Sequence, residues 1–284
     1  MIKIINYFIQ SVLIYLFFLT GRVLGLKFSR KIFSFLFSFF GPFFKSKKII
    51  DSNLEKFSNH ALTAKEKIIN SMWRNYGMTF IEYIFLSNFR KDNSHIQIKG
   101  EKKLIDIIAK KKQVIFISGH FANFELMSME ITKRNISLAT IYRPLNNIFL
   151  NPFMEYLRKK YICKNQIKKG INGVREVVEY INAKSSIALM IDQRVSEGEL
   201  INFFGNPALT TTLPAQLSMK YNIEIMPVSI KRKEDHNFII QFHDTLNPKK
   251  FKNKIELTHE LNKVLEQMII ENPGQWIWSH NRWK

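Results

Sequence analysis

The 284-residue sequence predicts an α/β fold in which a mixed, mostly parallel sheet is covered by helices. One observation supports the covered sheet, and a second adds an N-terminal anchor helix to the predicted architecture. Short, wholly apolar segments that suit buried strands alternate along the chain with segments of helical periodicity. An uncharged N-terminal stretch precedes them and predicts a membrane-anchor helix. We therefore expect residues 1–50 to form a membrane anchor with a basic, Phe-rich segment, and residues 51–284 to form one folded domain.

The first expected element is an apolar helix from Ile4 to Gly21, a run without any charged residue. Its length is near the lower limit for crossing the roughly 30 Å hydrocarbon core of a bilayer. A cleaved signal peptide is the alternative, but Arg22 follows Gly21 directly and no small-residue cleavage site is present. Of the eight Lys and Arg among the first fifty residues, seven follow this run. The positive-inside rule therefore predicts that the rest of the chain is cytoplasmic.

The next segment, Ile32–Phe44, reads IFSFLFSFFGPFF and is too short to span a membrane. Gly41 and Pro42 are expected to interrupt it, and basic residues flank it on both sides. It is interpreted either as an interfacial element at the membrane surface or as a helix packed on the folded domain. Both descriptions can hold for different faces of the same segment.

Strands and helices then follow in alternation. Helical periodicity covers residues 61–85, and a continuous apolar strand follows at 114–118. The remaining expected helices are 122–133, 149–160, 172–183, 213–221 and 257–270, and the remaining strands are 138–142, 187–191, 224–230 and 238–242. The connection from Arg194 to Thr212 is expected to be a long functional loop.

The composition limits the partners. Lys and Arg number 43 against 23 Asp and Glu, so the formal net charge is +20 and a polyanionic partner is expected. Nucleic acid, a phosphate-bearing lipid surface and an acidic protein all qualify. The single cysteine, Cys163, excludes an intrachain disulfide and a multi-cysteine zinc site. No metal or cofactor is predicted.

The first candidate site follows the strand at 114–118, in the segment GHFANFE. An imidazole titrates near neutrality and can take a proton from a hydroxyl, so His120 is a candidate general base. Glu125, five residues on, is the candidate carboxylate that orients the ring. This pairing requires His120 to lie in the turn and Glu125 in the first helical turns. A capped His at a helix start with an unrelated Glu is the competing interpretation.

Two further strand ends carry polar side chains. Arg143, Asn146 and Asn147 follow the strand at 138–142, and their donors suit phosphate or carbonyl oxygens. Asp192 and Arg194 follow the strand at 187–191, where the carboxylate either acts in the site or pairs with Arg194 or Arg143. Because ligands bind beyond the carboxyl ends of strands in open α/β sheets, these groups are expected around one cleft with His120.

A third segment, FFGNPALTTTLPA, adds a Thr run that leads into a helix, and Thr210 is a candidate substrate-binding residue. An apolar slot is expected to lead from the cleft. Some of four phenylalanines are expected to line it: Phe121, Phe124, Phe203 and Phe204. A packed loop before a capped helix is the alternative for the Thr segment.

Five segments together resemble the lipid A biosynthesis acyltransferases. They are GHFANFE, YRPLNN, the DQR after a strand, FFGNPALTTTLPA and the C-terminal QWIWSHNRWK. The resemblance covers essentially the whole chain, and the family belongs to a superfamily with the glycerolipid acyltransferases, which usually have Asp where Glu125 stands. It implies a glycerolipid acyltransferase-like fold for residues 51–284. It also implies a membrane enzyme of the bacterial inner membrane whose catalytic domain faces the cytoplasm.

The reaction implied by the resemblance is transfer of an acyl chain from acyl carrier protein to a hydroxyl of Kdo-bearing lipid IVA or its monoacylated product. His120 would be the general base, with Glu125 as its partner and no acyl-enzyme. Arg143 would hold a phosphate, and Asp192 and Arg194 would shape the site. An acyltransferase for another glycolipid, phospholipid or aminolipid shares these motifs. A membrane-tethered nucleic-acid-binding protein would explain the charge but not the order of the motifs.

Overall fold

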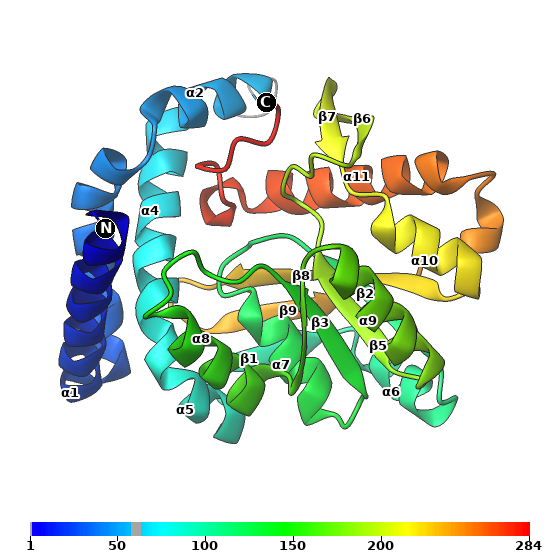
Figure 1. Cartoon of the computed structure of the whole chain (residues 1–284), viewed down its shortest axis with the longest axis horizontal. Coiled ribbons are helices and arrows are strands. Elements are labelled where there is room, and N and C mark those ends of the chain that lie inside the picture. The colour runs from blue at the N-terminus through cyan, green and yellow to red at the C-terminus, as the bar shows by residue number, and fades with distance from the viewer. Residues whose placement is uncertain (1, 58–63) are drawn as a thin grey trace.

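The computed structural model describes residues 2–57 and 64–284, which form a seven-stranded sheet covered by helices (Figure 1). In chain order the strands of this sheet are β1 (Ile96–Lys99), β2 (Val114–Ser118), β3 (Leu138–Tyr142), β4 (Asn165–Lys168), β5 (Ser186–Met190), β8 (Glu224–Arg232) and β9 (Phe238–Phe242). The principal helices are α1 (Ile2–Phe44), α2 (Lys47–Lys56), α4 (Lys65–Glu82), α5 (Leu86–Lys91), α6 (Glu101–Ala109), α7 (Glu125–Lys133), α8 (Asn151–Leu157), α9 (Ile171–Asn182), α10 (Leu213–Tyr221) and α11 (Lys254–Glu271).

The sheet is mixed and mostly parallel, which confirms the predicted fold class. Its strand order is β1-β9-β8-β2-β5-β3-β4, and only the pairing of β8 with β9 is antiparallel. β2, β5 and β3 are neighbours and run in the same direction. Their carboxyl ends therefore meet at one edge, and the loops after these strands are brought together there.

Two apolar cores lie on the two faces of the sheet, as expected for buried parallel strands. One core joins the side chains of β2, β5 and β3 that face α9, α10 and α11, with Ile117, Leu189 and Leu261 among its members. The other joins Phe116, Ala188 and Leu126 with the helices on the opposite face. α4 contributes to both cores and packs along α1 (Figure 1).

Several expected boundaries shift. The helix expected at 122–133 begins at Glu125, because Ala122 has a left-handed backbone with φ of 45°. The expected loop from Arg194 to Thr212 contains a two-stranded hairpin, β6 (Glu199–Phe203) and β7 (Asn206–Thr210). The helix expected at 61–85 starts at Lys65, and the positions from 61 to 63 lie outside the described residues.

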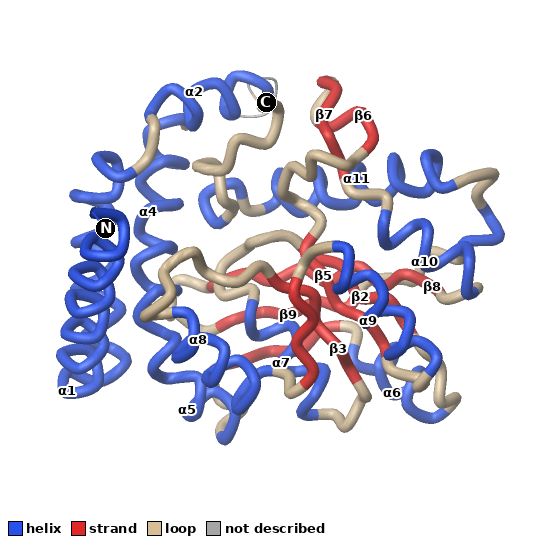
Figure 2. Tube along the Cα trace, in the orientation of Figure 1, coloured by secondary structure: helices blue, strands red, loops and turns tan. Residues whose placement is uncertain are grey.

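The N-terminal helix α1 is a hairpin, not one straight span followed by a separate element. Gly25, at φ 74° and ψ 166°, breaks the helical geometry, and the second segment runs back beside the first (Figures 1 and 2). The Phe17 and Phe33 rings meet across the turn at 5.6 Å, and the Ser29 hydroxyl donates to the Gly21 carbonyl at 2.8 Å. The interruption expected at Gly41–Pro42 is absent, since the second segment continues to Phe44.

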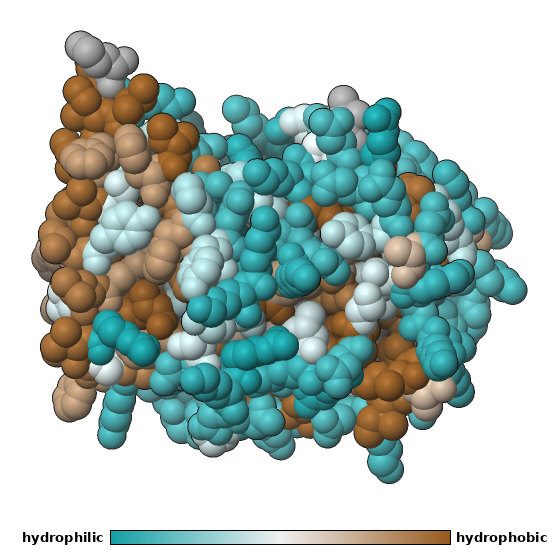
Figure 3. Space-filling model, turned by 60° about the horizontal axis from the view of Figure 1, so that its bottom comes forward, coloured by the Kyte–Doolittle hydropathy of each residue, from teal (hydrophilic) through white to brown (hydrophobic). Residues whose placement is uncertain are grey.

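One side of this hairpin packs on α4, which small residues allow. A Cβ added to Gly77 would lie 2.0 Å from the Phe33 carbonyl oxygen, and one added to Gly41 would lie 2.4 Å from the Trp73 ring. The opposite side exposes a large apolar patch along the hairpin (Figure 3). Its most exposed members are Ile2, Leu19, Val23, Phe28, Phe35, Phe39, Phe43 and Phe44. The hairpin therefore has both a domain-packing face and a free apolar face.

A buried ionic network joins the hairpin to the sheet. Glu82, fully buried on α4, accepts from Arg30 of the hairpin at 2.6 Å and from Arg232 of β8. Its other oxygen accepts from Asn123 Nδ2 at 2.9 Å, in the loop after β2. Burial favours the neutral carboxyl, but the two guanidinium groups outweigh this and lower the pKa of Glu82.

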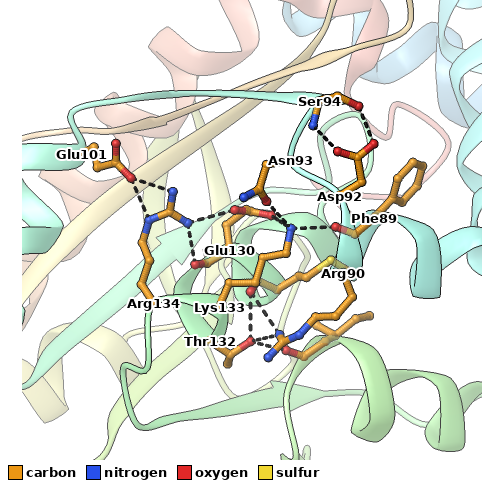
Figure 4. A network of polar contacts seen from close by, with 12 residues as sticks. Phe89, Arg90, Asp92, Asn93, Ser94, Glu101, Glu130, Thr132, Lys133 and Arg134 are labelled. Carbon is orange, nitrogen blue, oxygen red and sulfur yellow. Dashed lines mark hydrogen bonds and ion pairs between the residues drawn. The ribbon is translucent and has the colours of Figure 1, made fainter.

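The C-terminal end of α7 is fixed by a second polar network (Figure 4). Arg134 pairs with Glu130 at 2.9 Å and with Glu101 at 2.8 Å. Lys133 binds Glu130 at 2.9 Å and the Phe89 carbonyl at 2.6 Å. These contacts tie α7 to α5 and α6, so the helix that carries Glu125 at its start is held at its end.

Candidate active site

The loop between β2 and α7 presents His120 at the carboxyl edge of the sheet. The left-handed residue Ala122 is held at both of its backbone groups: its N–H donates to the Gln275 carbonyl at 3.1 Å, and its carbonyl accepts from Thr79 Oγ1 at 2.9 Å. Gly119 has no room for a side chain, because an added Cβ would lie 2.7 Å from the Phe121 ring. These contacts give the His120 side chain a defined direction.

Asp192 is the carboxylate that holds the His120 ring. Its Oδ1 lies 2.7 Å from His120 Nδ1, and its Oδ2 accepts from the His120 backbone N–H at 2.7 Å. The Trp276 indole donates to the same Oδ2 at 2.9 Å. A carboxylate acceptor at Nδ1 fixes the tautomer that carries its proton there, which leaves Nε2 as the basic nitrogen.

The electrostatics of this pair favour a basic imidazole. Burial of the ring lowers the pKa of His120, but the charge and hydrogen bond of Asp192 outweigh it and raise the pKa above its ordinary value. Burial alone would raise the pKa of Asp192, yet His120, its backbone N–H and Trp276 hold it below the usual range.

The predicted hydrogen bond from the His120 ring to the Glu125 carboxylate is wrong: it is absent from this structure. Glu125 Oε1 instead accepts from Arg158 at 2.7 Å and from the Tyr83 hydroxyl. The physical reason is the bend at Ala122, which places Glu125 at the start of α7 while Asp192 occupies Nδ1 of the ring. Glu125 nevertheless lines the same cavity as His120.

Arg158, from the π-helical turn after α8, is a site residue that the sequence analysis missed. Burial lowers the pKa of its guanidinium, but Glu125 and Tyr83 outweigh this and raise it, so the group stays charged. Its Nη1 is buried without a hydrogen-bond partner among the described residues, and Arg158 lines the cavity. No motif surrounds this arginine, and only the fold brings it to Glu125, 33 positions earlier.

His120 opens on a cavity of about 510 Å³ that lies between the loops and the α7 side of the sheet. Its rim includes Arg143, Asn146, Lys45 and Lys169, and its interior includes Met127, Ser128, Ile162, Ala188 and Met190. Glu125 is the acidic residue in this lining, and its charge is paired with Arg158. The rim is thus cationic and the interior mostly apolar, a combination that suits an amphiphile with an anionic head.

The structure brings His120, Arg143, Asn146 and Asp192 to this edge, but three other predicted site residues serve structural contacts. Asn147 stabilises the turn before α8, where its Oδ1 accepts from the Phe149 and Leu150 N–H groups, and its Nδ2 donates to the Tyr7 carbonyl at 2.8 Å. Thr210 is buried and accepts from Arg282 at 2.7 Å. Arg194 donates to the Lys284 carbonyl at 3.1 Å. Asp192 pairs with neither of the arginines expected for it.

Of the four phenylalanines expected to contribute to the apolar slot, one lines it. Phe124 lines the cavity, with its ring 4.6 Å from the imidazole. Phe121 and Phe203 are fully buried in the core behind the sheet edge, and Phe204 packs there against Phe57. β6 and β7 form a hairpin that turns Phe203 toward Trp276 and Phe204 toward Trp283. The rest of the slot is lined mainly from α7, β3 and β5.

Comparison with known proteins decides the family. The model of the bacterial lipid A biosynthesis acyltransferases matches residues 2–284. The chain belongs to this family. It is 25% identical over 252 residues to the lipid A biosynthesis palmitoleoyltransferase of Escherichia coli K12 and equally to a lipid A biosynthesis acyltransferase of Shigella flexneri. Each alignment covers 86% of this chain and 80% of the relative.

Among solved structures, the 1-acyl-sn-glycerophosphate acyltransferase of Thermotoga maritima matches 89% of this chain and all of its own. That likeness has a TM-score of 0.43 at 14% identity. The family assignment makes this acyltransferase an enzyme of lipid A biosynthesis.

Proposed function

We propose that this acyltransferase moves a fatty acyl chain from the thioester of acyl carrier protein to a hydroxyl of a lipid A precursor. The acceptor is Kdo-bearing lipid IVA or its monoacylated product. The observation that carries the proposal is the His120–Asp192 pair at the mouth of a cavity with a cationic rim and an apolar interior. The cationic rim residues Arg143, Lys45 and Lys169 suit the phosphates of such an acceptor.

The chemistry requires a base and a stabilised oxyanion. His120 Nε2 takes the proton of the acceptor hydroxyl while its oxygen attacks the thioester carbonyl. Collapse of the tetrahedral intermediate forms the ester, breaks the carbon–sulfur bond and returns the proton to the leaving thiolate. Asp192 orients the ring and stabilises the imidazolium between these steps. This direct transfer needs no acyl-enzyme.

In this proposal Glu125 acts through Arg158. The unpartnered Nη1 of Arg158 supports a role as donor to the negative charge that develops on the thioester oxygen. Glu125 and the Tyr83 hydroxyl hold the guanidinium in position. Loss of Glu125 would then impair catalysis without removing the base.

The experiment that tests the function is mass spectrometry of lipid A from cells that lack the gene and regain it as wild type or as His120→Ala. Wild type should restore a mass difference of one acyl chain, which also reports its length. His120→Ala should restore none although the protein accumulates in membranes, because the hydroxyl has lost its base. An unchanged lipid A profile with a mass change in another lipid would instead favour a different glycolipid, phospholipid or aminolipid acceptor.

We further propose that the protein is attached to the cytoplasmic face of the bacterial inner membrane by the α1 hairpin. α1 has the length and apolar composition of a membrane-spanning helix. One side of the hairpin is occupied by α4 along its length, and Arg22 near its turn lies 3.5 Å from Asn88 of α5. A crossing hairpin would draw these polar helices into hydrocarbon at high cost. These contacts support a hairpin that lies in one leaflet with its apolar patch inward.

A further inference from the structure

The loop between β3 and α8, residues 143–150, connects the cavity to the hairpin, and we call it the rim loop. Its first half, from Arg143 to Asn146, lines the cavity. Its second half is bound to the hairpin: Asn147 donates to the Tyr7 carbonyl at 2.8 Å, and the Tyr15 hydroxyl donates to the Phe149 carbonyl at 2.9 Å. One short segment therefore touches both the candidate active site and the apolar anchor.

The rim loop carries apolar side chains that the fold does not bury. Leu145, Ile148 and Phe149 are 37%, 58% and 38% exposed. The Phe149 ring packs edge-on against Phe8 at 5.5 Å, and Phe8 is itself 55% exposed on the hairpin. The apolar patch of the hairpin thus continues across the rim loop up to the cavity mouth. An exposed apolar surface of this extent indicates a partner, and its continuity with the anchor indicates lipid.

The shape of the loop is determined by its own polar contacts. Asn147 Oδ1 accepts from the N–H groups of Phe149 and Leu150 at 3.1 and 3.2 Å, and Asn151 Oδ1 accepts from the Leu145 N–H at 2.8 Å. These bonds satisfy backbone groups that hydrocarbon cannot hydrate. The exposure of Ile148 and Phe149 is therefore a property of a fixed turn.

We infer that the rim loop is a membrane-inserted port, through which a lipid-borne acceptor passes sideways from the bilayer into the cavity beside His120. The inference rests on the proposed function and adds the route of the substrate. Acyl chains that stay in contact with Leu145, Ile148 and Phe149 avoid the free-energy cost of exposing their CH₂ groups to water. Arg143 and Lys45 on the cavity rim then meet the anionic head at the depth of the headgroups.

The direct test is a fluorescent label on the rim loop. The native Cys163 is buried, so Ile148→Cys provides an accessible thiol for an environment-sensitive NBD dye on the full-length protein. Ile105→Cys on α6 is the matched control, because Ile105 is an apolar residue of similar exposure, 56%, outside the hairpin and the rim loop. Both proteins are bound to phosphatidylglycerol–phosphatidylethanolamine vesicles.

The label at position 148 should shift to the blue and brighten several-fold on vesicle binding, while the label at 105 keeps its aqueous spectrum. An aqueous spectrum at 148 on protein that sediments with vesicles would overturn the inference. This measurement does not depend on activity, so it stands or fails separately from the proposed reaction.

A kinetic experiment tests the route by which the acceptor enters the cavity. Ile148→Asp should raise the KM for the acceptor in vesicles about tenfold, while hydrolysis of the acyl donor by water keeps its wild-type rate. Ile105→Asp should leave both quantities unchanged. An acceptor KM that Ile148→Asp does not change, or that Ile105→Asp raises equally, would contradict entry through the rim loop.

Discussion

At the scale of single residues, the candidate site consists of an imidazole held by one carboxylate and a guanidinium held by another. Asp192 accepts two hydrogen bonds from His120 and one from Trp276, whereas Glu125 accepts from Arg158. Two carboxylates near one imidazole therefore have different expected roles. The distinction can be measured, because only Asp192 determines both the tautomer and most of the upward pKa shift of His120.

We predict that Asp192→Asn lowers kcat roughly 10²- to 10⁴-fold and moves the acid limb of the pH profile of kcat/KM to lower pH. The direction of this shift follows from the pKa of His120. Asp192 raises that pKa, and without the charge of Asp192 the burial of the ring lowers it. Glu125→Gln should also lower kcat, but with a smaller shift of the limb. Stopped assays from pH 5 to 9 measure both. An acid limb that follows Glu125 rather than Asp192 would restore Glu125 as the partner of the base.

At the scale of elements, the hairpin is part of the catalytic fold and not a detachable anchor. Arg30 reaches from the hairpin to Glu82, and Glu82 in turn holds Asn123 in the loop that carries His120. Asn75 Nδ2 and Thr79 Oγ1 both donate to the Ala122 carbonyl, at 3.5 and 2.9 Å, so α4 supports this loop at several points. A shift of the hairpin on α4 is thereby linked to the position of the imidazole.

We predict that Asn123→Ala lowers kcat about tenfold or more while the acceptor KM and vesicle binding stay near wild type. The substitution removes the bond to Glu82 but leaves Glu82 paired with both arginines, so no buried charge loses its only partner. A small displacement of a catalytic group suffices for a loss of this size. Thermal unfolding in detergent is the control for folding. Unchanged kcat in a folded variant would show that the loop needs no support from α4.

The contrast between expected and observed elements has a physical cause. Strands such as β2 and β3 are continuous apolar runs and were predicted to within a residue of their bounds, whereas β4 reads NQIK and gives no such signal. Site residues at strand ends, such as His120 and Asp192, follow from parallel topology. Arg158 and the partner of the imidazole could not be predicted, because both depend on the left-handed bend at Ala122 and on contacts between distant segments.

At the scale of the whole molecule, the rim loop lies between the apolar patch and the cavity mouth, and the hairpin turn lies beside α5. In the proposed attachment, this arrangement places the candidate site at the membrane surface without a crossing helix. The first uncharged run predicted a single anchor helix, whereas the chain turns back at Gly25 and Arg22, near the turn, lies over the Phe85 ring of the folded domain.

We therefore predict that the hairpin turn and the catalytic domain are accessible from the same side of the membrane. Lys27→Cys near the turn and Asp244→Cys after β9 place thiols at two exposed positions. In inverted inner-membrane vesicles a membrane-impermeant maleimide should label both, and in intact cells with a permeabilised outer membrane it should label neither. The buried Cys163 gives the background of the parent chain. Labelling of the Lys27→Cys thiol from the periplasmic side, with the Asp244→Cys thiol protected there, would mean that the hairpin crosses the bilayer. In that case the membrane-bound form could not have the hairpin packed on α4 along its length.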